Sequence, residues 1–236
     1  MTRLFLLTRE PKKNIVDMKT RFKDYPARFV SIPLIEIVYD FQWSFEKVEE
    51  LEGYPWIFFV SPSSVNAFFE TLKEYIKTNS SMVSKIEQIL KLKYFAVVGP
   101  FTGKELVKHG YNIGFMPSKS YGKNLIDEWV KAYPNEIEPL WIIGNKGNIK
   151  NYAKYGNYWQ MYKNQCPLGS PEKLREYMKE NIITDYFVSS PSIWSRFFYV
   201  AKDFPNYPPI DYYVLGNTTY RAIKRDLGKY VNIKVL

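Results

Sequence analysis

Short apolar runs recur along this chain, and most of them lead into segments whose apolar positions have helical spacing. After residues 56–60 (WIFFV), apolar residues recur from Val65 to Ile76 at i, i+3, i+4, i+7 and i+11, which is one face of a helix. Short strands that alternate with helices predict parallel α/β sheets with right-handed crossover connections. The runs that we interpret as strands are residues 4–9 (LFLLTR), 56–60 (WIFFV), 94–99 (YFAVVG), 140–144 (LWIIG), 185–190 (DYFVSS) and 211–216 (DYYVLG).

Two longer segments are typical of extended chain. Residues 28–40 (RFVSIPLIEIVYD) are rich in β-branched residues, and Pro33 limits how centrally they can pair, because proline has no amide donor. Residues 158–167 (YWQMYKNQCP) form the second segment. We also expect a short helix around Tyr152, and a helix that ends at Gly110, since glycine is the usual residue after a helix C-terminus.

Two pairs of segments repeat along the chain. Residues 59–69 (FVSPSSVNAFF) resemble residues 187–198 (FVSSPSIWSRFF), and each reads as a strand, a Ser-Pro-Ser corner and a helix. Residues 98–110 (VGPFTGKELVKHG) resemble residues 215–228 (LGNTTYRAIKRDLG) in the same way, each reading as a strand, a Gly-x-x-Thr corner and a helix. The second pair matches at Gly99 and Gly216 and at Thr102 and Thr219.

The order of these repeats predicts two similar lobes, one inserted in the other. A weaker likeness links the LFLLTREPKKN segment near the N-terminus, which precedes both copies, to LWIIGNKGN, which closes the first copy. We therefore expect residues 1–38 and 165–236 to form one discontinuous α/β lobe, and residues 39–164 to form the inserted lobe. Each lobe would hold a parallel sheet flanked by helices, and two paired strands, from residues 28–40 and 158–167, would connect them.

Composition limits the class of protein. With 236 residues, 46% of them hydrophobic and 18% aromatic, the chain can bury one large core or two smaller ones. Its only cysteine, Cys166, cannot form an internal disulfide, which suits a reducing compartment. The apolar stretch near the N-terminus, residues 4–7, is too short for a signal peptide, and no window approaches a membrane helix. We therefore expect a cytoplasmic protein that does not associate with membranes.

The formal net charge of +9 allows an anionic partner but identifies none. A lysine-rich composition explains the same charge without any ligand. The basic residues are scattered, and no run of five or six marks a nucleic-acid-binding tail.

Hydroxyl side chains gather at the predicted strand-to-helix corners. Free amide groups and the positive end of the helix dipole at such corners favour carboxylate or phosphate ligands. Helix capping explains any one of these residues equally well, because Ser and Thr are preferred N-caps. Four such corners in two facing copies favour an anion-binding cleft between the lobes. The residues are Ser61, Ser63, Thr102, Ser189, Ser190, Ser192 and Thr219.

The sequence lacks the residues and motifs that several other kinds of chemistry require. The single histidine, His109, lies at a predicted helix end, and no G-x-S-x-G elbow accompanies it for a Ser-His triad. One His and one Cys cannot build a zinc site of the usual type. The GPFTGKE stretch (99–105) lacks the Walker pattern, and no G-x-G-x-x-G occurs. We therefore expect no metal and no organic cofactor.

An ordered set of motifs resembles the uroporphyrinogen-III synthase family and covers nearly the whole chain. Each motif is degenerate, but the set in this order is specific. The motifs are LLTRE near the N-terminus, IPLIEI (32–37), VSPSSVNAFF, VVGPFTGKEL, MYKN (161–164), VSSPSIWSRFF and VLGNTTYRAI.

The resemblance implies a cofactor-independent lyase of tetrapyrrole (heme) biosynthesis. Members of the family take linear hydroxymethylbilane, invert its ring D, close the macrocycle and release water. The substrate carries eight carboxylates, which gives the positive charge and the hydroxyl-lined corners a partner, bound between the lobes. We expect this small molecule as the partner of a monomer, with no nucleic acid and no membrane.

The resemblance also implies site residues. Tyr162 takes the place of the family's most prominent tyrosine, on the returning strand, and is the catalytic candidate. Packing is the alternative for a strand tyrosine in a chain with 20 tyrosines. The sequence departs from the family pattern at Asn164 and Val60, where threonines are usual. The expected substrate-binding residues are Thr8, Arg9, Ser61, Ser63, Ser64, Thr102, Ser189, Ser190, Ser192 and Thr219.

Two other classes share some of these features. A two-lobed cytosolic binding protein for an anionic small molecule would have the same architecture. A basic, aromatic-rich nucleic-acid-binding module would have the same charge, but no recognition motif for nucleic acid is present.

Overall fold

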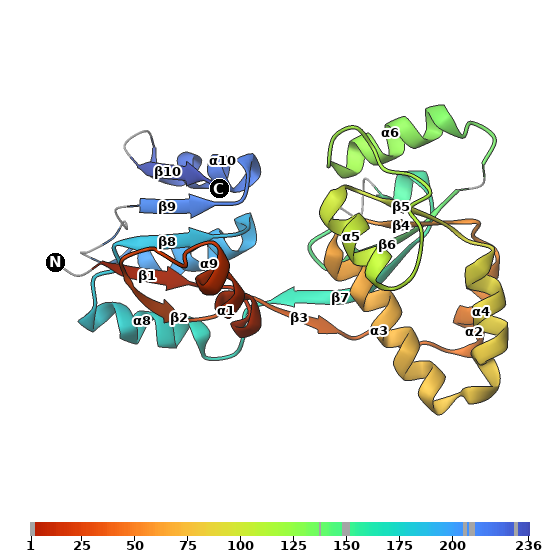
Figure 1. Ribbon diagram of the computed structural model, residues 1–236, viewed down its shortest axis with the longest axis horizontal. Coiled ribbons are helices and arrows are strands. Elements are labelled where there is room, and N and C mark those ends of the chain that lie inside the picture. The colour runs from red at the N-terminus through yellow and green to blue at the C-terminus, as the bar shows by residue number, and fades with distance from the viewer. Residues whose placement is uncertain (1–2, 137, 148–151, 205–206, 208–210, 229–230) are drawn as a thin grey trace. The chain divides into compact units, whose positions relative to one another are not determined.

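The computed structural model describes residues 3–136, 138–147, 152–204, 207, 211–228 and 231–236 (Figure 1). The chain divides into two compact units. Unit 1 comprises Met1–Glu36 and Gln165–Leu236, and unit 2 comprises Ile37–Asn164.

Unit 1 has a five-stranded sheet in the order β10-β9-β8-β1-β2, and all of its strand pairs are parallel. The winding reverses between β1 and β8, because β2 follows β1 on one side while β8, β9 and β10 follow one another on the other. The elements are β1 (Leu4–Leu7), α1 (Pro11–Thr20), β2 (Arg28–Ser31), α8 (Ser170–Glu180), β8 (Asp185–Val188), α9 (Pro191–Ala201), β9 (Asp211–Val214), α10 (Asn217–Leu227) and β10 (Asn232–Val235).

Unit 2 has a second five-stranded sheet, in the order β3-β7-β6-β4-β5. Its β4–β5, β4–β6 and β6–β7 pairs are parallel, and the winding reverses between β4 and β6. The elements are β3 (Glu36–Tyr39), α2 (Phe45–Glu52), β4 (Trp56–Phe59), α3 (Pro62–Thr78), η1 (Ser80–Met82), α4 (Val83–Lys91), β5 (Tyr94–Val97), α5 (Pro100–Lys108), α6 (Gly122–Ala132), β6 (Leu140–Gly144), η2 (Ala153–Tyr155) and β7 (Tyr158–Gln165).

The two sheets have matching strand positions, so the fold prediction of two similar α/β lobes is confirmed. The order β9-β8-β1-β2 in unit 1 corresponds to β5-β4-β6-β7 in unit 2, and the two Ser-Pro-Ser corners lie in different sheets. A parallel bridge from Ala96 to Phe115 occupies the position that β10 holds in unit 1. The weak likeness between the N-terminal segment and LWIIG is explained as well, because β1 and β6 hold equivalent positions in the two sheets.

The extended segment predicted at residues 28–40 is two strands rather than one. Residues 28–31 form β2 in the sheet of unit 1, and only β3, at residues 36–39, lies beside β7 (Figure 1). The chain around Pro33 still follows β1, since the amides of Ile32 and Leu34 donate to carbonyls at the end of that strand. Pro33, which has no amide hydrogen, falls between these two donors and interrupts nothing.

Each sheet buries both faces, which explains why its strands read as continuous apolar runs. In unit 2, one face packs against residues from α2, α3, α4 and α5, and the other packs against α6. In unit 1, α8, α9 and α10 cover one face, while Phe22, Met18 and Tyr25 from α1 and the loop after it cover the other. None of the helices in the described ranges has the length and apolar character to cross a bilayer.

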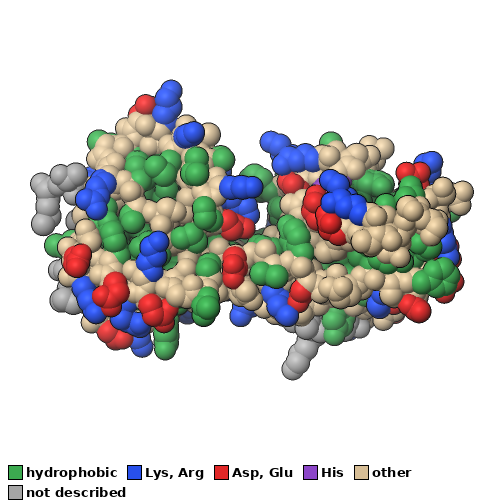
Figure 2. Space-filling model, turned by 90° about the horizontal axis from the view of Figure 1, so that it is seen from below, with side chains coloured by type: hydrophobic (Ala, Val, Ile, Leu, Met, Phe, Trp, Pro, Cys, Tyr) green, Lys and Arg blue, Asp and Glu red, His purple; other side chains and the backbone are tan. Residues whose placement is uncertain are grey.

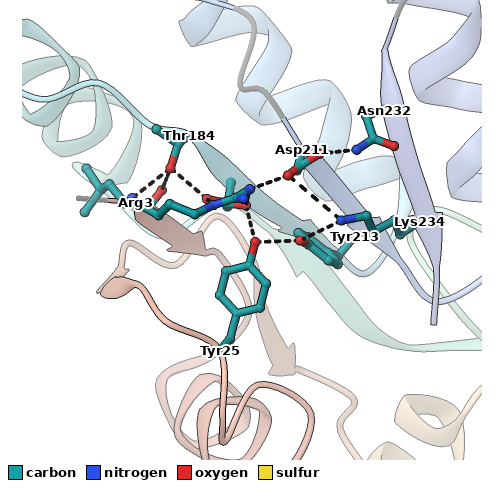
Figure 3. Close-up of polar contacts among 9 residues, drawn as sticks. Arg3, Tyr25, Thr184, Asp211, Tyr213, Asn232 and Lys234 are labelled. Atoms are coloured by element: carbon teal, nitrogen blue, oxygen red, sulfur yellow. Dashed lines mark hydrogen bonds and ion pairs between the residues drawn. The ribbon is translucent and has the colours of Figure 1, made fainter. Parts of the chain in front are cut away.

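A partly buried polar cluster closes the amino edge of the sheet in unit 1 (Figure 3). Arg3 Nε donates to Asp185 Oδ2 at 2.9 Å, and its Nη2 contacts both Asp185 and Asp211. The hydroxyls of Tyr25 and Thr184 each donate to Asp185 at 2.7 Å. Burial alone would raise the pKa of Asp185, but the hydrogen bonds from Arg3, Thr184 and Tyr25 outweigh it and hold that pKa below its ordinary value. This cluster is structural, since it joins the beginnings of several strands.

The predicted end of α5 at Gly110 is confirmed, and the structure shows what His109 does beside it. Gly110 has a φ of 88°, in the left-handed region that favours glycine after a helix. His109 is a structural residue, because its Nε2 lies 2.8 Å from Asn66 Oδ1 and its ring stacks on Phe69.

Candidate functional site at the carboxyl ends of the strands

Four helices begin directly after strands at the carboxyl edges of the two sheets. These edges are where open α/β sheets bind ligands, especially where the winding reverses. In each unit, one of the two helices begins at a serine that caps it, and the other begins at a glycine without a side-chain cap. The two kinds of corner offer different groups to a ligand.

The capped corner of unit 2 lies between β4 and α3. Ser61 Oγ accepts from the amide of Ser64 at 3.0 Å, and Ser64 Oγ accepts from the amide of Ser61 at 3.1 Å. This reciprocal capping box explains why Ser64 is fully buried. Of the predicted binding residues here, Ser64 is therefore committed to the helix, whereas Ser61 and Ser63 are partly exposed.

The capped corner of unit 1 lies between β8 and α9. Ser190 Oγ accepts from the amide of Ile193 at 3.4 Å and lies 3.1 Å from Ser192 Oγ. Ser189, Ser190 and Ser192 are all partly exposed. The structure thus brings these three predicted residues together at one helix start.

The helices at the two glycine corners have no side-chain cap, but the corners differ, because α5 begins with Pro100, which has no amide hydrogen, and a Cβ at Gly99 would lie 2.3 Å from Ser120 Oγ. Gly99 precedes α5 and Gly216 precedes α10. Thr102 and Thr219 lie in the first turns of these helices, are almost fully buried, and make no side-chain hydrogen bond within the described part of the chain. A Cβ atom at Gly216 would meet nothing within 4 Å. The corner at Gly216 can accept a carboxylate on backbone amides.

Tyr162 reaches the carboxyl edge of unit 2 through a bulge in β7. Pairing with β6 shifts register here, so that Ile143 pairs with Gln160 but Gly144 pairs with Tyr162. The bulge places Met161 and Tyr162 in the same core cluster, although neighbouring strand residues normally face opposite sides. The Tyr162 ring lies against Gly144 so closely that a Cβ there would be 2.4 Å from it.

The hydroxyl of Tyr162 lies 2.9 Å from Ser61 Oγ, and either oxygen can donate. Burial raises the pKa of Tyr162, and the hydrogen bond with Ser61 only partly opposes this. The phenol is therefore neutral near pH 7 and can donate a hydrogen bond to an oxygen that is gaining negative charge. The structure joins Tyr162 to one of the predicted corner residues.

The two predicted residues after β1 have partners inside unit 1. Thr8 is fully buried, and its hydroxyl lies 3.0 Å from that of Tyr186 on β8. Arg9 Nη1 donates to Asp17 Oδ2 at 2.8 Å, so its guanidinium is paired with a nearly buried carboxylate. These two residues shape the corner more than they offer free groups to a ligand.

Sequence reasoning missed two residues that build this edge. Asn14 accepts from the amide of Arg9 at 3.0 Å and donates to the carbonyl of Arg9 and to Ser31 Oγ, which fixes the corner after β1. Gly144 makes room for the Tyr162 ring. The glycine that ends the LWIIG run was a visible signal, but a lone polar residue such as Asn14 in a helix gives none.

Positive charge is not gathered into one patch on the face drawn in Figure 2, where Lys and Arg side chains are interspersed with Asp and Glu. Within the described ranges, no group of three or more His, Cys, Asp or Glu residues could hold a metal ion. The groups that the corners offer are hydroxyls, open helix amides and the Tyr162 phenol. Together they can bind carboxylates and donate hydrogen bonds.

Comparisons with known proteins place the chain in a family. The family model described as uroporphyrinogen-III synthase HemD matches residues 16–232. A uroporphyrinogen-III synthase of Chlorobaculum parvum is 25% identical over 238 aligned positions, which cover 97% of this chain and 91% of the relative. A putative uroporphyrinogen-III synthase of Methanocaldococcus jannaschii is 26% identical over 205 positions, which cover 83% and 78%.

Solved structures show the same fold. A crystal structure of a mutant uroporphyrinogen III synthase from Thermus thermophilus superposes with a TM-score of 0.66 at 12% identity, covering 99% of this chain and 92% of that one. The uroporphyrinogen-III synthetase of Helicobacter pylori gives a TM-score of 0.58 at 15% identity with the same coverage. Because the family model spans nearly the whole sequence and the fold agrees, this chain belongs to the uroporphyrinogen-III synthase family.

Proposed function

We propose that this chain is a uroporphyrinogen-III synthase, which converts linear hydroxymethylbilane to uroporphyrinogen III with inversion of ring D and loss of water. The observation that carries the proposal is the family match along residues 16–232. The corners support it, since each unit offers hydroxyls and an uncapped helix start for the carboxylates of such a substrate.

In the chemistry accepted for this family, the C–O bond of the hydroxymethyl group breaks and hydroxide leaves, which gives an azafulvene cation. The substituted carbon of ring D attacks this cation to form a spiro-pyrrolenine. That intermediate fragments and recloses at the free carbon of ring D, with loss of a proton. Water is the net product released, so no external oxidant or reductant is needed. We propose that this chain needs no metal and no organic cofactor.

The protein's main task is to hold a flexible tetrapyrrole in the geometry that favours inversion of ring D. The free substrate closes to the macrocycle without this inversion. Orientation of this kind can lower a barrier by several kcal/mol, up to about 7–11 kcal/mol in well-oriented intramolecular reactions. Backbone amides at an uncapped helix start, such as that of α10 after Gly216, would hold a carboxylate arm of the substrate without a distinctive side chain. The binding roles of Ser61, Ser63 and Ser190 to Ser192 belong to this proposal.

Tyr162 is the proposed catalytic residue. Its neutral phenol would donate a hydrogen bond to the departing hydroxide, while the Ser61 hydroxyl holds the phenol oxygen in place. The single cysteine is partly exposed and unpaired, and we propose that the protein works as a monomer in the reducing cytoplasm.

The direct test is to incubate the purified protein with hydroxymethylbilane, oxidise the products and resolve the uroporphyrin isomers. The III isomer should form faster than the spontaneous I isomer, and dialysis against a chelator should leave its rate unchanged. If hydroxymethylbilane binds but only the I isomer appears at the spontaneous rate, the chain is an anion-binding protein instead. If nucleic acid at physiological salt competes with hydroxymethylbilane for binding, the chain is a nucleic-acid-binding module.

A further inference from the structure

A cavity of about 390 Å³ lies in unit 2, beside the sheet face that α6 covers. Its volume is near the lower end of the range for small-molecule sites, about 300–1,000 Å³. Its lining includes three aromatic residues, Trp141, Tyr152 and Tyr155, and three charged residues, Lys123, Asp127 and Lys154. None of these residues belongs to the four corners described above.

The aromatic part of the lining is held in place by the fold. Trp141 of β6 is fully buried, and its Nε1 donates to the carbonyl of Tyr155 at 3.3 Å. The Tyr152 ring packs on Trp141 with centroids 4.8 Å apart and a tilt of 34°. These rings form a preset apolar wall, which suits a flat ring better than a flexible chain.

The charges at the cavity are predominantly positive. Lys123 and Asp127 extend from α6, and Lys154 extends from η2, where its Nζ lies 5.2 Å from the centre of the Tyr155 ring. Within the described residues, neither lysine forms an ion pair with a carboxylate. Two unpaired cations against one carboxylate favour an anionic group on the ligand.

Tyr152 links this cavity to the site that contains Tyr162. Its ring lies close to two glycines at the carboxyl edge, since a Cβ at Gly122 would be 3.0 Å from its hydroxyl and one at Gly147 would be 3.5 Å from its Cε2. Burial raises the pKa of Tyr152, and negative charge on Tyr162 would raise it further, so the two phenols are within electrostatic reach. The Tyr152 hydroxyl makes no hydrogen bond to any residue in the described ranges, and it is a neutral donor.

We propose that this cavity holds one pyrrole ring of the substrate, with Lys123 and Lys154 binding a carboxylate arm of that ring and the Tyr152 hydroxyl donating to it. The inference rests on the proposed function and deepens it, because it assigns one pyrrole ring of the tetrapyrrole to this cavity of unit 2. A pyrrole that carries acetate and propionate arms combines a flat ring with anionic groups, and the cavity offers aromatic walls with cations at their rim.

The first experiment measures binding of a monopyrrole with one acetate and one propionate arm, by calorimetry on the full chain. Lys123→Gln and Lys154→Gln should each weaken binding about 5- to 30-fold, as expected for loss of a charge-assisted hydrogen bond. Tyr152→Phe keeps the ring and should weaken binding about 2- to 10-fold. Lys131→Gln is the matched control, because Lys131 is an exposed lysine of α6 that does not line the cavity.

The second experiment measures KM and kcat for hydroxymethylbilane, with melting temperatures alongside. The three cavity variants should raise KM with unchanged melting temperature, and Lys131→Gln should match the wild type. If the wild type makes the III isomer but Lys123→Gln and Lys131→Gln behave alike, the inference is wrong and the proposed function stands. If the monopyrrole binds in a lysine-dependent way but no III isomer forms, the pyrrole site stands and the synthase function falls.

Discussion

The hydroxyl of Tyr162 and the side-chain oxygen of Ser61 lie 2.9 Å apart, although the two residues are far apart in the sequence. Ser61 Oγ also accepts from the amide of Ser64, so it is fixed by the start of α3. Its own hydrogen can then point at the phenol oxygen, which leaves the phenol hydrogen free for a ligand. The capping box of a helix thus orients the proposed catalytic donor.

The first prediction concerns Tyr162→Phe. Loss of one preorganised donor typically slows a reaction by about 10²–10³-fold, and we expect the lower end or less in a site that water can enter. The III-isomer rate of the wild type should fall only at a more alkaline pH than that at which an exposed phenol ionises, because burial raises the pKa of Tyr162 and only the neutral form donates. Initial rates of the III isomer across pH measure both effects, and the phenylalanine variant should lack the alkaline fall.

A double-mutant cycle with Ser61→Ala is the control for that prediction. If Ser61 acts by holding the phenol, the rate losses of the two single variants should not add. Ser61→Ala should also cost about 1 kcal/mol of stability through loss of the N-cap. A Tyr162→Phe enzyme as fast as the wild type would make Tyr162 a packing residue and leave catalysis to the corners.

The second prediction concerns Gly144→Ala. The new Cβ would lie 2.4 Å from two atoms of the Tyr162 ring, so the ring or β6 must move. Overpacking of this kind costs about 1–3 kcal/mol, and the displaced phenol should lower the rate as well. Gly53→Ala is the matched control, because a Cβ there would meet only the Glu50 carbonyl oxygen at 3.5 Å. Equal melting temperatures and rates for Gly144→Ala and the wild type would contradict the packing of Tyr162 on Gly144.

Much of the fold was predictable because its strands are buried on both faces and read as plain apolar runs. The paired Ser-Pro-Ser and Gly-x-x-Thr corners also revealed the repeat, since each copy needs the same turn from strand to helix. The division of residues 28–40 into β2 and β3 was not predictable, because the same apolar chain suits either sheet. The helices α2, α4, α6 and α8 carry no corner motif and were not assigned.

The site was less predictable than the fold. A bulge decides that Tyr162 faces the core beside Gly144, and register shifts of this kind leave no mark in the alternation of residue types. The predicted hydroxyls also divide into groups that sequence cannot separate. Ser64 and Thr8 are buried with internal partners, whereas Ser63 and Ser192 are partly exposed. Tertiary contacts, not residue identity, make that division.

The third prediction concerns the Arg3–Asp185 pair at the amino edge of unit 1. The hydrogen bonds hold the folded-state pKa of Asp185 below its ordinary value, so the carboxylate adds stability above its unfolded pKa of about 4. That stability is lost as the pH falls through the folded pKa. Asp185→Asn should cost about 1–3 kcal/mol at pH 7, since it removes a buried carboxylate from its hydrogen bonds with the partly exposed Arg3, and much less near pH 2.

Urea unfolding at the two pH values measures this difference. Asp24→Asn is the control, because Asp24 is exposed and has no ion pair within the described ranges. A cost for Asp185→Asn that is the same at both pH values would mean that packing, rather than the charge, makes Asp185 important.

The last prediction concerns Gly216, at the open corner before α10. Its backbone is extended, with φ of 176° and ψ of 171°, which any residue can adopt, and a Cβ would enter empty space. Gly216→Asp should therefore keep the fold and cap α10, and its charge interacts favourably with the helix start. The same carboxylate would occupy the open amides and repel a substrate carboxylate, so KM for hydroxymethylbilane should rise about 10-fold or more. Gly216→Asn has nearly the same shape and also caps α10, but it lacks the charge, so its KM should lie between those of Gly216→Asp and the wild type.

Melting temperatures at or slightly above that of the wild type for both variants would show that the start of α10 is intact. If Gly216→Asp turns over hydroxymethylbilane with the KM of the wild type, the α10 corner does not bind a substrate carboxylate, and its open amides are simply solvated.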